Sequence, residues 1–381
     1  MTVSAPRYFD HAATTPMRQI AVDTWAEHAH LLNPGGQYAS GRAANAVLAQ
    51  ARETVAEILG ADPVEVIFTA SGTEADNVAL RGFAGEPGAR VISTPIEHPA
   101  VRETVADVEK RGADVQMLPV GEDGVVDVTD VLDEPAAVAT CMWANNETGA
   151  IQPIEEIIAR ADVAGTPVHV DAVQVVGHLP VDFHALGATT LAASAHKFGG
   201  PRGAGILLAK RSPAPSPVLT GGGQQRGIRP GTVDVTTAAA TAAALKEAVG
   251  EMDAEAARLA TLRDELVHAA IATIPDAHAT VLGREGMQVL PGHAHLIFPG
   301  ANGDAMIMLL DSQGIEASTG SACNNGVNQR SHVLEAMGLP DDYADGALRF
   351  TLGRTTTDKD VQYLLERLPE VIGKARDVAK L

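Results

Sequence analysis

The chain has 381 residues, of which 45% are hydrophobic and only 3% aromatic, and its formal net charge is −20. A chain of this length usually forms more than one core, so we expect two domains. The acidic balance argues against nucleic acid or an acidic membrane surface as partner. The chain has two cysteines, no C-x-x-C metal spacing and no run of roughly 18 apolar residues, so we expect a cytoplasmic protein without a metal site.

Short apolar runs alternate with helical patterns between residues 65 and 210. Each run is followed by polar or glycine residues, an order typical of βαβ units. The sequence therefore predicts an α/β fold with a mostly parallel central sheet and helices on both faces. The runs occupy residues 65–69, 90–94, 136–143, 168–171 and 205–209.

Polar residues gather at the carboxyl ends of these runs. In an open α/β sheet the carboxyl edge is where ligands bind. The clustering predicts a single site made of residues from distant parts of the chain. The residues are Ser71 to Thr73, Glu97 and His98, Asn145 and Asn146, Asp171, and His196 and Lys197.

The last third of the chain has a different pattern. Residues 236–274 are rich in alanine, leucine and glutamate, which predicts one or two long helices leading out of the first domain. Apolar runs at 295–298 and 347–352 follow, and an amphipathic helix begins near Asp358. We expect a smaller α+β domain here.

Lys197 ends a stretch of small and apolar residues and precedes a glycine-rich one. A poorly solvated lysine has a lowered pKa and becomes a nucleophile that can form a Schiff base with an aldehyde. Taken alone, it is more often a lysine at a strand end whose amine reaches solvent. Asp171 ends a buried β-branched run, where an unpaired charge is costly. Pyridoxal phosphate would serve both residues, with its aldehyde for Lys197 and its protonated ring nitrogen for Asp171.

Other polar residues allow a ligand role and an ordinary one. Ser71 and Glu74 fit a capping box, and the helix that they begin could bind a phosphate through its free N–H groups. Ser194 could add a donor to that phosphate, as could His196. His98 could stack on a planar ring or simply be a solvated loop histidine.

Three further residues are noted for their surroundings in the sequence. Arg349 lies in an apolar run and needs an anion, for which a substrate carboxylate is a candidate. Asn146 belongs to a segment that could be merely a turn. Cys323 lies among small and polar residues, in a loop expected to be mobile and exposed, where an unreactive thiol would be unusual. Cys141 lies in an apolar strand and receives no role.

The motifs taken together resemble those of cysteine desulfurases, a group of the class V aminotransferase family. The two most specific motifs are His169-Val170-Asp171-Ala172-Val173-Gln174 and Ser194-Ala195-His196-Lys197-Phe198-Gly199-Gly200-Pro201. The match is to the long-loop group, similar to NifS and IscS, and runs in order along nearly the whole chain. The other matching segments are 9–16, 71–77, 97–101, 145–149, 320–323, 331–334 and 349–354.

The resemblance implies a fold-type I homodimer that uses pyridoxal phosphate. It implies a large cofactor-binding domain at 16–255 and a small domain formed by 1–15 and 256–381, which carries the Cys323 loop. It also assigns roles by position. Lys197 becomes the Schiff-base lysine, Asp171 the partner of the ring nitrogen, Gln174 a donor to the phenolic oxygen and His98 the stacking acid/base. It places five residues at the cofactor phosphate: Gly72, Thr73, Ser194, His196 and, from the other subunit, Thr232. It assigns the substrate carboxylate to Asn146 and Arg349, and the sulfur to Cys323.

The implied reaction converts L-cysteine to L-alanine and leaves a persulfide on Cys323, which a sulfur-acceptor protein such as an iron–sulfur scaffold would receive. A selenocysteine lyase or an aminotransferase on the same fold is the alternative within enzymes. A sulfur-relay protein without catalysis is the alternative from another class. The sequence does not name the acceptor.

Overall fold

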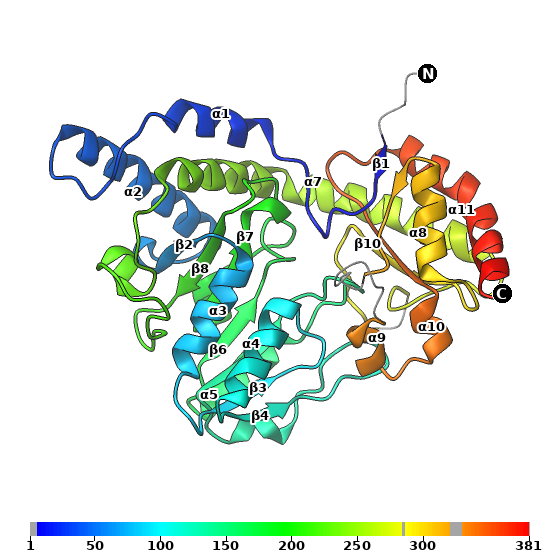
Figure 1. Ribbon diagram of the computed structural model, residues 1–381, viewed down its shortest axis with the longest axis horizontal. Coiled ribbons are helices and arrows are strands. Elements are labelled where there is room, and N and C mark those ends of the chain that lie inside the picture. The colour runs from blue at the N-terminus through cyan, green and yellow to red at the C-terminus, as the bar shows by residue number, and fades with distance from the viewer. Residues whose placement is uncertain (1–5, 284–285, 321–329, 381) are drawn as a thin grey trace.

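The computed structural model describes residues 6–283, 286–320 and 330–380. Its main sheet has seven strands in the order β2-β8-β7-β6-β5-β3-β4 (Figure 1). β8 is antiparallel to β2 and β7, and all other neighbours are parallel. The expected α/β class with a mostly parallel sheet is confirmed. The strands are β2 (Val66–Thr69), β3 (Arg90–Ser93), β4 (Asp114–Met117), β5 (Val138–Met142), β6 (Val168–Asp171), β7 (Thr190–Ser194) and β8 (Gly205–Ala209).

Helices cover both faces of this sheet because successive strand residues point to opposite sides. Ile67 packs in one apolar cluster with residues of α3 (Gly72–Phe83), and α4 (Pro99–Lys110) lies on that side too. The next residue along, Phe68, belongs to the large core that contains residues of α2 (Ala39–Leu59) and α5 (Ile154–Val163). Further elements of this half are α1 (Gln19–His28), α6 (Phe183–Leu186) and the 3₁₀ helices η1 (Pro63–Glu65), η2 (Asp130–Asp133), η3 (Ala195–Lys197) and η4 (Gln224–Gly227).

A second apolar core forms around a small antiparallel sheet of order β12-β10-β9. A separate parallel pair joins β1 to β11 and brings the N-terminal segment to this half (Figure 1). Among the described residues, no helix is both long and apolar enough to cross a lipid bilayer. The elements are β1 (Arg7–Tyr8), β9 (His278–Ala279), β10 (His293–Ile297), β11 (Ile315–Glu316), β12 (Ala347–Thr351), α8 (Gly303–Ser312), α9 (His332–Ala336), α10 (Asp341–Asp345) and α11 (Asp358–Val378).

One long helix, α7 (Val235–Thr273), connects the two cores (Figure 1). Its first half packs into the large core through residues such as Leu245, and its second half packs into the smaller one through residues such as Leu266. The sequence allowed one or two helices here, and the structure has one. The proposed domain boundary at residue 255 falls inside this helix and stays a prediction.

The N-terminal segment runs from the smaller core to the carboxyl edge of the main sheet. Phe9 is buried in the smaller core, and the N–H of Ala12 donates to Thr351 Oγ1 at 2.9 Å. A few residues later, the N–H of Thr15 donates to the carbonyl of His196 at 3.1 Å. This path places residues 10–15 directly over the edge where ligands of α/β proteins bind.

Candidate active site

A cavity of about 260 Å³ lies at the carboxyl edge of the main sheet, beside the N-terminus of α3. The polar residues that end β5, β6 and β7 do meet there. Every predicted cofactor residue except Thr232 lines the cavity, and so does Asn146. The lining residues are Ala13, Ser71, Gly72, Thr73, Asp76, His98, Met142, Asn146, Asp171, Val173, Gln174, Ser194, His196 and Lys197.

Lys197 enters the cavity from the 3₁₀ turn η3 that directly follows β7. Its Nζ donates to the carbonyl oxygens of Ala12 and Ala13, at 3.0 Å for Ala13. Burial lowers the pKa of Lys197 to about 8, with a further lowering by Arg349, while Asp171 opposes the shift. A larger fraction of the amine is therefore uncharged near neutral pH than in a solvated lysine, and an uncharged amine is nucleophilic.

Asp171 ends β6 and is 5% exposed. Its Oδ1 accepts a hydrogen bond from the N–H of Val173 at 2.9 Å. Burial raises the pKa of Asp171 to about 6, against the opposing effects of the Val173 N–H and Lys197. A cationic N–H group in the cavity would stabilise the ionised carboxylate at this position.

Two more buried acids, Asp76 and Glu97, lie close to Asp171. The sequence predicted Glu97 at this site without a role and did not indicate Asp76. Asp76 lies on the inner face of α3, with its Oδ1 3.1 Å from Nε2 of His169, whose Nδ1 lies 2.9 Å from Thr190 Oγ1. Glu97 precedes His98 and accepts from the N–H of Met142 at 3.1 Å. Burial raises the pKa of Asp76 well above its ordinary value and that of Glu97 to about 8, and Asp171 raises both further. Such a group of acids favours a ligand with positive charge.

The N-terminus of α3 forms one end of the cavity. Ser71 caps the helix by accepting from the N–H of Glu74 at 3.1 Å. A side chain at position 72 would lie 2.7 Å from Val173 Cγ2, so glycine lets the helix approach β6 and β7 closely. The first-turn N–H groups and the helix dipole make this end suited to a phosphate.

His98 is the N-cap of α4, and its Nδ1 accepts from the N–H of Ala100 at 3.1 Å. Burial, and then the charge of Lys197, lower the pKa of His98 to about 4. The ring is therefore neutral near pH 7, with the proton on Nε2. A neutral imidazole in the cavity wall can stack on a planar ligand and donate from that nitrogen.

Gln174 and His196 connect the cavity to the N-terminal segment. Gln174 Nε2 donates to the carbonyl of Ala12 at 3.1 Å, the same carbonyl that Lys197 contacts. His196 Nδ1 lies 3.1 Å from Thr14 Oγ1, and burial lowers the pKa of His196 to about 4. The segment 12–14 thus shapes the cavity through backbone atoms and a hydroxyl. It lies in the matching segment 9–16, to which the sequence assigned no role.

Arg349 lies on β12 and is 4% exposed. From the sequence, Arg349 needs an anion, for which a substrate carboxylate is a candidate. The structure supplies an anion from the chain itself, because Nη2 donates to Asp10 Oδ1 at 2.6 Å. Nη1 donates to the backbone carbonyl of Asn146 at 2.8 Å, and the buried Nε has no partner among the described residues.

Among the described residues, the predicted Thr232 and Arg349 do not line the cavity. Thr232 is exposed in the loop before α7 and is absent from the cavity lining. Cys323 lies outside the described residues. Cys141 is fully buried in β5, and burial raises its pKa well above the ordinary value, as expected for a thiol without a role.

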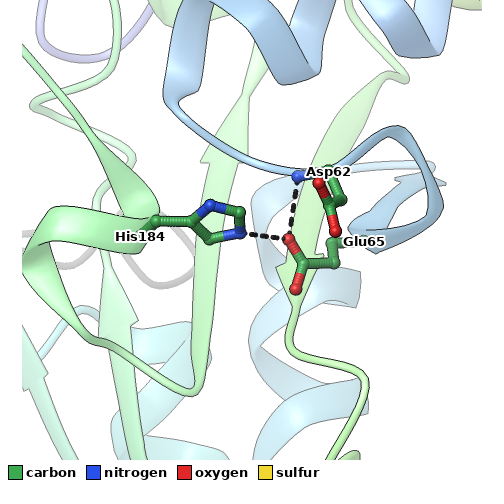
Figure 2. A group of neighbouring side chains, drawn as sticks. All are labelled: Asp62, Glu65 and His184. Carbon is green, nitrogen blue, oxygen red and sulfur yellow. Dashed lines mark hydrogen bonds and ion pairs between the residues drawn. The ribbon is translucent and has the colours of Figure 1, made fainter.

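Asp62, Glu65 and His184 form another group of potential ligands, away from the cavity (Figure 2). Glu65 Oε2 accepts from the N–H of Asp62 at 2.9 Å and from His184 Nε2 at 2.7 Å. Asp62 also pairs with Arg211 at 3.2 Å. These bonds cap η1 and attach it to α6, so we interpret the group as a structural contact between these two short helices.

Comparisons with known proteins agree with this geometry. The family model described as "Aminotransferase class-V" matches residues 7–364. This chain belongs to the class-V aminotransferase family. The "IscS-like cysteine desulfurase" of Mycobacterium tuberculosis is 45% identical to it, and the match covers 98% of each chain.

Solved structures extend the match to the fold. A "NIFS-LIKE PROTEIN" superimposes with a TM-score of 0.89 at 33% identity, covering 97% of this chain and 100% of its own. A structure described as "SspA in complex with cysteine" does so with a TM-score of 0.78 at 29% identity, covering 91% and 98%. The expected resemblance to NifS-like and IscS-like cysteine desulfurases is confirmed, and so is the expected fold class.

The cavity has the features that pyridoxal phosphate requires. It offers an amine of lowered pKa for the aldehyde and a buried carboxylate for the ring nitrogen. It also offers a helix N-terminus for the phosphate and a neutral imidazole for the ring face. The donor set therefore fits this cofactor.

Proposed function

We propose that this chain is a cysteine desulfurase that uses pyridoxal phosphate to convert L-cysteine to L-alanine and transfers the sulfur to Cys323. The observation that carries the proposal is the meeting of Lys197, Asp171 and the α3 N-terminus at one cavity. The full-length similarity to proteins named cysteine desulfurases supports the choice among class-V reactions.

We assign the cofactor contacts by chemistry and position. Pyridoxal phosphate, when bound, supplies an aldehyde that captures an amine and a protonated ring that accepts electrons. Asp171 would keep the ring nitrogen protonated, His98 would stack on the ring and Gln174 would donate to the phenolic oxygen. Phosphate contacts would come from Gly72, Thr73, Ser194 and His196, and from Thr232 of the partner in a homodimer.

The chain's own side chains would carry the proton and sulfur transfers. Arg349 and the Asn146 side chain would hold the cysteine carboxylate, and the neutral amine of Lys197 would take the Cα proton. Cys323, as a thiolate, would attack the substrate sulfur. The carbon–sulfur bond breaks, a sulfur–sulfur bond forms on Cys323 Sγ, and protons delivered to the former Cβ and back to Cα give alanine. The carbon is reduced as the sulfur is oxidised, so no external oxidant is needed.

The persulfide would then pass to a sulfur-acceptor protein, of the kind that assembles iron–sulfur clusters. A cytoplasmic location agrees with the two cysteines of the chain, because a persulfide carrier needs a reducing compartment. A selenocysteine lyase or aminotransferase on the same fold stays the alternative, as does a sulfur-relay protein without catalysis.

The Cys323→Ser variant tests the proposal. It should bind pyridoxal phosphate and cysteine normally but form alanine at roughly 10²-fold lower rate or less, because a hydroxyl is a far weaker nucleophile toward sulfur. Mass spectrometry of the peptide with Cys323 should find one added sulfur atom in the parental protein. Undiminished alanine formation by the variant would instead favour direct elimination by a lyase.

A further inference from the structure

Asp76 is a buried acid that lines the cofactor cavity and has no part in the reaction proposed above. It lies on α3 one turn after Gly72 and is 1% exposed. Residues four apart share one face of a helix, so Asp76 lies on the face of α3 that borders the cavity and the sheet. Because an unpartnered charge in the interior is costly, a carboxyl at this position needs partners.

Two neighbouring strands supply a chain of polar groups to Asp76. Its Oδ1 lies 3.1 Å from Nε2 of His169 on β6, and Nδ1 of that ring lies 2.9 Å from Oγ1 of Thr190 on β7. An ionised carboxylate only accepts hydrogen bonds, so with Asp76 ionised the Nε2–H group donates to Oδ1 and the Thr190 hydroxyl donates to Nδ1. His169 is fully buried, and burial lowers its pKa to about 3. The chain therefore supports the ionised form of Asp76 through a neutral donor.

Asp76 and Asp171 act on the same part of the molecule. His169 and Asp171 lie on one face of β6, because alternate residues of a strand point the same way. Asp76 and Asp171 both line the cavity, so the charges of both reach a ligand bound there. Burial, then the charge of Asp171 and then that of Glu97, raise the pKa of Asp76 well above its ordinary value. A cationic group beside Asp171 would relieve this repulsion and favour the ionised form of Asp76.

Glu97, the third acid of the group, differs from Asp76. It is absent from the described lining of the cavity, and its buried Oε2 has no partner among the described residues. Burial, and then the charge of Asp171, raise the pKa of Glu97 to about 8, so this carboxyl stays protonated near neutral pH. Strands β2, β7 and β8, which also pack on α3, carry no ionisable side chain, and Asp107 of α4 pairs with Arg81. Asp76 and Asp171 are therefore the two acids of this group that can present charge to a ligand.

We propose that Asp76, held by His169 and Thr190, is a second carboxylate close to Asp171 that strengthens the binding of a cationic pyridine ring. The inference rests on the proposed function for the identity of the cofactor. It goes beyond that function, which gives the ring nitrogen to Asp171 alone. Two negative charges attract a cation more strongly than one, so Asp76 should raise the affinity for a protonated ring but not for a ring without nitrogen.

The experiment compares two ligands that differ only in one ring atom. Pyridoxal phosphate has the ring nitrogen, and deazapyridoxal phosphate has a C–H group in its place, so only the first can carry charge on the ring. Equilibrium dialysis of the cofactor-free protein gives the dissociation constant of each ligand for the parental protein and for Asp76→Asn. Asparagine keeps the shape of the side chain and an oxygen that accepts from His169. We expect pyridoxal phosphate to bind roughly 10-fold more weakly to the variant, and the deaza ligand to change by less than about twofold.

Thr190 and Thr140 provide a matched pair of variants for the polar chain. They flank His169 in register, on β7 and on β5. The Thr190 hydroxyl contacts the imidazole, whereas the buried Thr140 Oγ1 has no partner among the described residues. Thr190→Val should weaken pyridoxal phosphate binding about threefold and leave the deaza ligand unchanged, because His169 loses the donor that orients it toward Asp76. Thr140→Val should change neither, and this pair tests the inference even if Asp76→Asn does not fold.

The possible results separate this role of Asp76 from the proposed function. Equal weakening of both ligands in Asp76→Asn would overturn the inference, because it would show that Asp76 only maintains the structure. Parental affinity for pyridoxal phosphate in Asp76→Asn would overturn it too, as would equal effects of Thr190→Val and Thr140→Val. Failure of the parental protein to bind pyridoxal phosphate would overturn the proposed function together with the inference, whereas the other results leave that function standing.

Discussion

Charge is balanced differently in the cavity and beside it. We call Lys197 and Asp171, which line the cavity, its floor. We call the ion pair of Arg349 with Asp10 its rim, because Arg349 donates to the carbonyl of the lining residue Asn146. On the floor, Asp171 is buried and Lys197 is half-buried, and their pKa values are displaced toward the uncharged forms, to about 6 and about 8. At the rim, the buried Arg349 is neutralised by an ion pair with Asp10 at 2.6 Å. The floor therefore lacks a group of opposite charge that a bound ligand can provide. At the rim, the protein itself provides that group, the Asp10 carboxylate. A floor of this kind binds a fixed cofactor, and a rim of this kind suits a substrate that arrives and leaves.

Removing Lys197 should have the largest effect and is the most direct way to break this comparison. Lys197→Ala should lower cysteine turnover by at least roughly 10³-fold, because the nucleophilic amine and proton acceptor are lost together. Borohydride treatment of the loaded parental protein, followed by peptide mapping, should label Lys197. Labelling of a different lysine would show that the floor has been misassigned.

Asp171→Asn keeps the shape of the floor and removes its negative charge. Turnover should fall by roughly 10²-fold, and pyridoxal phosphate should dissociate faster on dialysis, because the ring nitrogen loses its counter-charge. The absorbance of retained cofactor and the rate of alanine formation measure the two effects. Asp162→Asn, an exposed position on α5, is the matched control and should change neither. Parental retention and rate in Asp171→Asn would refute the ion-pair role.

Substitutions of the two partners of the ion pair between Arg349 and Asp10 test the rim, because they should affect the KM for cysteine differently. Arg349→Lys should raise the KM for cysteine about tenfold, because lysine cannot bind a carboxylate with two parallel hydrogen bonds. Asp10→Asn should leave that KM unchanged or lower it, since Arg349 loses a competing anion, but should reduce thermal stability. Steady-state kinetics and thermal unfolding give both answers. A raised KM in Asp10→Asn would show that Asp10 helps to bind the substrate.

The smallest expected effect is a shift in the pH profile of cofactor attachment, which reports how Arg349 at the rim affects Lys197 on the floor. The aldehyde reacts with the uncharged amine, so the rate of cofactor attachment to the cofactor-free protein should rise with pH and level off above about 8. An ordinary lysine would continue to gain rate to above about pH 10. Because Arg349 helps to lower the pKa of Lys197, Arg349→Met should move the midpoint to higher pH. Arg111→Met, on the surface, should not move it.

The same contrast explains what could be predicted from the sequence. The floor was largely predictable, because Asp171 ends β6, Lys197 and His98 lie within five residues of the ends of β7 and β3, and parallel strands bring their carboxyl ends to one edge. The rim was not, because Asp10 and Arg349 are 339 positions apart and only the packing of the N-terminal segment brings them together. The hydrogen bond that Ser331 Oγ donates to Glu147 could not be predicted for the same reason, since the two residues are 184 positions apart.

Asp76 could have been found from the sequence. It lies on the face of α3 that also presents Gly72 and Ala79, and an acid on a buried helix face needs a partner. The roles of Thr232 and Cys323 stay predictions. Thr232 depends on a second subunit, and Cys323 lies outside the described residues.

The continuous helix α7 has a mechanical consequence for this site. Arg18 pairs with Glu247 at 2.8 Å and with Glu251 at 2.7 Å, so it links two turns of α7 on either side of Gly250. Gly250 lies between the helix residues of the large core and those of the smaller core. From there the helix extends roughly 35 Å to its end, at 1.5 Å per residue. A bend of about 5° at Gly250 would swing that end by about 3 Å, as a lever about a fixed pivot. Arg349, carried by the smaller core, would move with it, so the stiffness of α7 contributes to how constant the distance between floor and rim is, together with the hydrogen bond from Arg349 to the Asn146 carbonyl.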